Sequence, residues 1–241
     1  MLFREKADKI NISYLARKKK LVKTFMAIIK KTSLVDQVYD RLRKDIISLQ
    51  LPLGSKLNVN ELQTKLGVSC TPIREAVNRL QLEGLVEYEV NVGAHVLTLT
   101  VHDVEEIQLL AMTLHKAAIG LSMKDGDRSK IAADFKKHLK EYRAAKNIQS
   151  EVTAINMMIG TFYKNCGNRR LDKSMISIQG QQLLLRYVYA NCQETRGTDA
   201  ASFAQMLQGV QAGDVGTVFQ ALEETAEQMT SELKKLFNSQ N

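Results

Sequence analysis

The chain has 241 residues, a length typical of two domains, and 44% of them are hydrophobic. It contains no run of about eighteen apolar residues, so we expect no membrane-spanning helix. The three cysteines, Cys70, Cys166 and Cys192, have neither paired nor metal-ligand spacing, which argues against a disulfide scaffold and favours the reducing cytoplasm.

The formal net charge of +8 comes entirely from the first 32 residues, which contain ten Lys or Arg and two Asp or Glu. Residues 33–241 carry 24 basic and 24 acidic side chains, so the global charge is no evidence that they bind nucleic acid. Two interpretations of residues 1–32 stay open. Either the run Arg17–Lys20 is a basic arm that reaches phosphates, or Met26 is the true first residue.

A short helix is expected after residue 58. Asn58 is a favourable N-cap, and Val59, Leu62 and Leu66 recur at helical spacing before Gly67 ends the pattern.

A second helix is expected a few residues later. Ser69 precedes Pro72 in the first turn, which is a helix-start signal, and Gly84 ends the helix. The predicted apolar stripe contains Ile73, Val77, Leu80 and Leu82, which leaves Arg74, Asn78 and Arg79 to face outward. Two helices joined by a turn that contains Gly are typical of a helix-turn-helix.

The segment 85–99 alternates in hydropathy and breaks at Asn91-Val92-Gly93. This pattern predicts a β-hairpin with Gly at its tip. Together with the two helices, the hairpin predicts a winged helix-turn-helix.

These segments resemble the N-terminal domain of GntR-family transcriptional regulators. The resemblance rests on VSCTPIREAVNRLQLEGLVEY and VGAHV, and it covers about residues 33–99. It implies a DNA-binding regulator, by default a repressor, that binds an inverted-repeat operator on double-stranded DNA as a homodimer. Such regulators commonly begin as this chain does at Met26, so we favour an untranslated extension for residues 1–25.

The resemblance also implies which residues contact DNA. Hydroxyls at a helix N-terminus suit phosphate, and Arg suits guanine or phosphate. Cys70 stands where the family most often has Arg; we interpret it as a small neutral substitution, and redox sensing by a thiol at a helix N-terminus is the alternative. The candidate DNA-binding residues are Arg43, Asn60, Ser69, Cys70, Thr71, Arg74, Asn78, Arg79, Asn91, Gly93 and His95.

From residue 101 onward the chain lacks proline, and helical periodicity covers 102–123, 128–146, 150–166, 170–191, 200–211 and 215–237. The connections are short, which predicts an antiparallel bundle of about six helices. The expected fold is therefore mostly α. We divide it into a basic extension (1–32), a winged helix-turn-helix (33–100) and a helical effector-binding and dimerisation domain (101–241).

Two short segments, CGNRRL at 166–171 and QAGD at 211–214, resemble the C-terminal domain of FadR-like GntR regulators, the FCD domain. That resemblance implies an effector pocket, often with a metal held by one Asp and three His. The corresponding positions here are Ile155, Ile159, Phe203 and Thr225, a set that cannot replace those ligands. We therefore expect no metal and no other cofactor.

The usual Arg and Glu of the first FCD helix correspond to Ala111 and His115. Of the remaining polar residues, Arg186 is the strongest candidate because its apolar neighbours would leave it seeking a carboxylate, from ligand or protein. The effector-binding candidates are His115, Asn156, Tyr163, Gln182 and Arg186.

The leading hypothesis is a cytoplasmic transcriptional regulator that senses a small molecule. One alternative is a ligand-independent DNA binder whose pocket is packed shut. Another is a helical enzyme or sensor that uses the winged helix for protein contacts. No nucleophile–base pair, phosphate-binding Gly loop or metal set is evident in the sequence, so we do not expect an enzyme.

Overall fold

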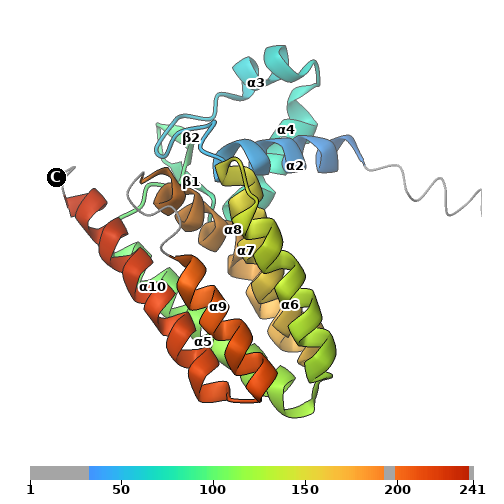
Figure 1. The fold of residues 1–241 in the computed structure, drawn as a ribbon. Coiled ribbons are helices and arrows are strands. Elements are labelled where there is room, and N and C mark those ends of the chain that lie inside the picture. Colours follow the sequence, from blue (N-terminus) through green and yellow to red (C-terminus); the bar gives the residue numbers. More distant parts are fainter. Residues whose placement is uncertain (1–32, 193–198, 239–241) are drawn as a thin grey trace, which may run out of the picture.

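A computed structural model describes residues 33–192 and 199–238 (Figure 1). The predicted basic arm and the proposed start at Met26 lie outside these residues. Helices α2, α3 and α4 and the hairpin β1–β2 form one end of the molecule, and the longer helices α5 to α10 form the rest. The elements are α2 (Leu34–Ile47), α3 (Val59–Leu66), α4 (Cys70–Leu82), β1 (Val86–Glu89), β2 (Gly93–Val96), α5 (Val101–Asp125), α6 (Arg128–Arg143), α7 (Ile148–Asn165), α8 (Arg169–Asn191), α9 (Asp199–Ala212) and α10 (Val215–Asn238).

The predicted helix-turn-helix is confirmed as α3 and α4. The Asn58 side chain accepts a hydrogen bond from the Asn60 N–H at 3.0 Å, and Gly67 ends α3 in the left-handed region with φ 66°. Because that conformation is favourable only for Gly and a few polar residues, the chain can turn sharply into α4.

The predicted hairpin is also confirmed. Strands β1 and β2 pair antiparallel, with Val86 opposite Val96 and Glu89 opposite Gly93. The segment before α3 joins this sheet, because the Leu57 N–H donates to the Ala94 carbonyl at 2.8 Å. The hairpin is thereby held against the helix-turn-helix.

The apolar stripe predicted for α4 is wrong at one residue. Ile73, Ala76, Val77 and Leu80 are buried, whereas Leu82 is 88% exposed. Position 82 follows Leu80 by two residues and so lies about 200° around the helix from it, on the outer face.

Six helices in the predicted segments form the C-terminal part, each beginning and ending close to the expected residues. Helix α6 packs against α7, α9 against α10, and α5 against α10, α8 and α7. N-caps explain several starts: Thr100, Asp127, Asn147 and Asn168 each accept a hydrogen bond from a backbone N–H in the first turn. Among the described residues, no helix is both long enough and apolar enough to cross a membrane.

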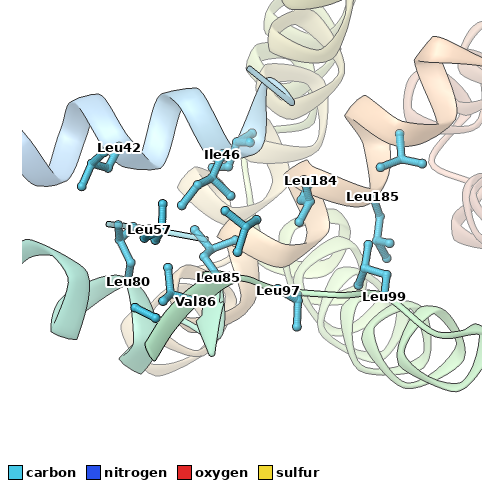
Figure 2. Close-up of a cluster of buried hydrophobic side chains, with 14 of the residues drawn as sticks. Leu42, Ile46, Leu57, Leu80, Leu85, Val86, Leu97, Leu99, Leu184 and Leu185 are labelled. Atoms are coloured by element: carbon cyan, nitrogen blue, oxygen red, sulfur yellow. The ribbon is translucent and has the colours of Figure 1, made fainter. Parts of the chain in front are cut away.

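Two hydrophobic cores hold the molecule together. One lies within the bundle and includes Phe135, Phe162 and Phe203. The other joins the winged helix to the bundle, since Leu184 and Leu185 of α8 belong to the same cluster as Leu42, Ile46, Leu57, Leu80, Leu85, Val86, Leu97 and Leu99 (Figure 2). The predicted division at residue 100 therefore separates chain segments that share a core.

Candidate DNA-binding surface and effector pocket

The outer face of α4 carries the central DNA-binding candidates. Thr71, Arg74 and Asn78 are exposed, while the opposite face of the helix is buried. Ser69 is the N-cap, yet within the described part of the chain its side chain makes no capping hydrogen bond. Its hydroxyl can therefore bind a phosphate at the helix N-terminus.

Cys70 is half-buried and contacts a residue of the preceding helix. Its Sγ donates to Gln63 Oε1 at 2.9 Å, which joins α4 to α3. Sequence reasoning missed Gln63, since a cysteine–amide contact seven residues apart has no sequence signal.

Two of the predicted DNA-binding arginines are bound to carboxylates. Arg79 forms an ion pair with Asp36 at 2.7 Å and lies 4.0 Å from the centre of the Tyr39 ring. This contact lowers the pKa of Asp36, chiefly through its hydrogen bond from Arg79. The guanidinium links α4 to α2 and is less available to DNA than that of Arg74.

Arg43 makes a similar contact at the same, C-terminal end of α4. Its Nε lies 2.9 Å from Glu83 Oε2, and the Tyr39 hydroxyl donates to the same carboxylate. Partial burial raises the pKa of Glu83 and lowers that of Arg43. The role of Arg43 as a DNA contact stays a prediction. In this structure the Arg43 side chain holds Glu83 at the end of α4.

The remaining candidates lie on α3 and the hairpin. Asn60 and Asn91 are exposed, and Asn91 and Gly93 have positive φ angles of 69° and 98° at the tip. His95 belongs to strand β2 instead, opposite Glu87 of β1, where its Nε2 is 3.1 Å from Glu87 Oε2 and its side chain is 16% exposed. The tip also exposes the apolar Val90 next to Tyr88, a feature that sequence reasoning did not single out.

Residues 33–100 have little net charge. Residues 33–100 contain seven Lys or Arg and eight Asp or Glu. Because phosphate neutralisation supplies most nonspecific DNA affinity, the described half offers few groups for it.

Four of the five effector candidates border one cavity. His115, Asn156, Tyr163 and Gln182 lie around a space of about 470 Å³ between α7 and α8. The fifth, Arg186, borders a separate space of about 10 Å³ toward α10, which His115 and Gln182 also line. His115 and Gln182 therefore lie between the larger cavity and the small space beside Arg186.

The imidazole of His115 is the centre of a buried hydrogen-bonded chain. Its Nε2 lies 2.6 Å from the Gln182 amide nitrogen and its Nδ1 lies 3.0 Å from the Tyr163 hydroxyl. Burial, with a smaller effect of Arg186, lowers the pKa of His115 to about 3, so the ring is neutral at physiological pH. In this arrangement the amide donates to Nε2, and Nδ1–H donates to the Tyr163 oxygen.

Arg186 has a carboxylate from the protein. Asp199 at the start of α9 interacts with it electrostatically, and burial raises the pKa of Asp199 to about 6 in spite of this cation. The electrostatics therefore favour a carboxylate of the same molecule as the countercharge of Arg186.

The metal-ligand positions of the FCD domain hold groups that cannot bind a metal. Ile155, Ile159 and Phe203 are buried in the core within the bundle, and the Thr225 hydroxyl donates to the Leu222 carbonyl at 2.8 Å. In residues 33–192 and 199–238, no three His, Cys, Asp or Glu side chains converge. These residues do not fit a metal centre, and metal analysis of purified protein tests the expectation, since a stoichiometric transition metal would contradict it.

Comparison with known sequences finds a family match in the N-terminal part of the chain. Residues 34–96 match the family described as bacterial regulatory proteins, gntR family. A stretch of 128 residues is 30% identical to the uncharacterized HTH-type transcriptional regulator YdhC of Bacillus subtilis, covering 53% of this chain and 57% of that protein. Another, of 123 residues, is 32% identical to the "Probable D-xylose utilization operon transcriptional repressor" of Paenarthrobacter nicotinovorans, covering 51% and 50%. The chain thus spans about half the length of these relatives.

Solved structures share the fold over most of the chain. A GntR-type transcriptional regulator from Rhodococcus sp. RHA1 superposes with a TM-score of 0.71 at 23% identity, covering 83% of this chain and 97% of that one. E. coli McbR/YncC gives a TM-score of 0.70 at 19% identity, covering 87% and 99%. At such identities the likeness establishes the fold alone, while residues 34–96 match the model of the gntR family of bacterial regulatory proteins.

Proposed function

We propose that this protein is a transcriptional regulator that binds a DNA operator through α4 and has no catalytic activity of its own. The observation that carries the proposal is the division of α4 into a buried face and an outer face with Thr71, Arg74 and Asn78. A recognition helix needs this division, because one side must anchor it while the other reads base edges in the major groove.

We further propose that the regulator acts as a cytoplasmic homodimer on an inverted repeat, by default as a repressor. On α5, Leu109 and Leu110 are 72% and 47% exposed, and exposed apolar groups of this kind support a contact between copies. A two-fold dimer would present two copies of α4 about one DNA turn apart.

Footprinting of the purified full chain on the DNA around its own gene tests this function. The expected result is a protected inverted repeat whose half-sites lie about 10 base pairs apart. Absence of any protected repeat would count against operator binding.

A second candidate is a regulator that binds DNA without an effector. The observation that favours it is the closed space of about 10 Å³ beside Arg186. A thermal-shift screen against metabolites distinguishes the two, because a ligand that binds only the folded state raises the melting temperature. A screen without any such ligand would favour the second candidate.

A further inference from the structure

We propose that the cavity between α7 and α8 binds a small uncharged molecule with an oxygen acceptor on an apolar body. The proposal rests on the proposed function in one respect, because it names a binding site and a ligand class for the predicted effector-binding domain. It does not depend on DNA binding.

The inner end of the cavity is polar but uncharged. The hydrogen-bonded chain from Gln182 through His115 uses the Tyr163 oxygen as an acceptor, which leaves the Tyr163 O–H to donate elsewhere. Burial raises the pKa of this phenol, so the proton stays on it. A ligand oxygen at this end would accept the unused hydrogen bond.

The middle of the cavity combines apolar surface with amides. Met157, Met175 and Ile176 supply the apolar wall. Gln179 reaches across from α8 to Asn156 of α7 at 3.4 Å, a long hydrogen bond that a ligand could replace with shorter ones. Both amides can donate and accept, so they suit a carbonyl or hydroxyl group better than a charge.

The charged side chains are confined to exposed positions at the rim. Lys164, Arg169 and Asp172 border the cavity and are exposed to solvent. Asn168 already accepts from two backbone N–H groups at the start of α8, both at 3.1 Å, which removes them as anion donors. Arg186 does not line this cavity: it borders the separate small space that His115 and Gln182 also line, and it interacts with Asp199. A carboxylate at the inner end would therefore lose its hydration without a direct ion pair, which is unfavourable.

Helix α8, which lines the cavity, also contacts the segment that directly follows α4. Gln181 follows Gly180 in α8 and donates from its Nε2 to the Gly84 carbonyl at 3.1 Å, just after α4. A Cβ on Gly180 would lie 3.0 Å from Leu85 Cδ1, so the backbone of α8 approaches the winged helix closely there. A ligand that shifts α8 would therefore also displace the residues at the end of α4.

Matched fragments test the ligand class without DNA. Saturation-transfer NMR on the full chain compares benzamide with benzoate at millimolar concentration, since the two share size and differ in charge. We expect a transfer signal for benzamide and a weaker one for benzoate. Benzoate bound as well as or better than benzamide would overturn the uncharged class, and no benzamide signal would overturn the site.

Variants locate the binding. Gly160 lies on α7 at the cavity, and a Cβ there meets nothing within 4 Å, so Gly160→Trp should fill the space and abolish the benzamide signal. If the tryptophan prevents folding, Gly160→Leu is the alternative variant that fills the cavity. Ser174→Trp, on the exposed surface of α8, is the matched control and should keep the benzamide signal. Tyr163→Phe should weaken binding about threefold to tenfold, as expected for one hydrogen bond.

A benzamide signal unaffected by filling the cavity would overturn the proposal, because binding would then be elsewhere. The footprint of the same preparation reports operator binding separately. Failure of the cavity proposal with an intact footprint leaves the DNA-binding function standing.

Discussion

Three arginines within residues 33–100 differ in whether a carboxylate of the protein pairs with them. Arg79 and Arg43 are paired with Asp36 and Glu83, whereas Arg74 projects from the exposed face of α4. The first two guanidiniums must break an ion pair before they can contact DNA. Arg74 therefore has the strongest claim to read a base.

Replacing this residue tests that claim. Arg74→Ala should weaken specific operator binding by about 1–3 kcal/mol, the usual contribution of an Arg that reads a base. A mobility-shift titration measures the change. Arg143→Ala, which removes the same charge from the exposed end of α6, is the control and should change specific binding little. Equal losses in both variants would contradict a specific role for Arg74.

His115 predicts how stability depends on pH. Its pKa is about 3 in the folded protein against an ordinary value of 6.5, so the unfolded chain binds the extra proton as the pH falls below 6.5. Linkage then makes this residue lower the free energy of unfolding by about 2 kcal/mol between pH 7 and pH 5. Asp199 acts in the opposite direction, because its folded pKa is raised to about 6.

Comparison with His115→Gln isolates the histidine. Denaturant unfolding of both proteins at pH 7 and pH 5 should show the wild type losing its advantage over the variant on acidification, while the effect of Asp199 cancels in the difference. A pH-independent difference would show that the buried imidazole does not have the assigned pKa.

At the scale of elements, two helical glycines have different surroundings. Gly209 faces the junction of α9 and α10, where an added Cβ would lie 2.8 Å from Val218 Cγ2 and 3.0 Å from the Asp214 carbonyl oxygen. Gly160 on α7 has open space at the same position. The first is required for close packing, and the second is not.

Alanine at each position should therefore change stability in opposite directions. Gly160→Ala should stabilise the protein by about 1 kcal/mol, because Ala is the better helix former. For Gly209→Ala the same gain is opposed by an overpacking penalty of about 1–3 kcal/mol, and we expect net destabilisation. Melting temperatures from circular dichroism measure both, and a rise of similar size in both variants would contradict the assigned packing.

Helix positions were predictable from the sequence because their signals are local. Asn58, Gly67 and Asn168 act within a few residues of themselves, so caps and periodicity located the elements. Tertiary partners were not predictable in the same way. The ion pairs of Arg43 and Arg79 join residues about forty positions apart, a distance at which the sequence carries no local signal.

Among the candidate effector residues, the sequence located some correctly and could not identify the partner of another. His115, Asn156, Tyr163 and Gln182 were chosen as polar residues expected inside the bundle, and the fold brings all four to one cavity. Arg186 was chosen for its need of a carboxylate, and Asp199 meets that need from another helix. Charge alone could not distinguish a ligand partner from a protein partner.

At the scale of the whole molecule, charge is unevenly divided. The first 25 residues contain eight Lys or Arg, while residues 33–100 have slightly more acidic than basic side chains. We expect the full chain to bind DNA with a steeper salt dependence than a chain that begins at Met26. The slope of log K against log salt should differ by about 0.9 for each phosphate that the basic segment neutralises. Titrations at several salt concentrations measure it, and equal slopes would contradict a basic arm.

The core that α8 shares with the winged helix has a consequence for unfolding. Leu184 and Leu185 are fully buried against residues of the DNA-binding half, so neither half can lose its structure without exposing apolar surface of the other. Two domains joined only by a linker would melt in separate steps, whereas a shared core couples them into one cooperative unit. The winged helix therefore could not be fused to a different C-terminal domain unless that domain also supplied an apolar face equivalent to the one on α8.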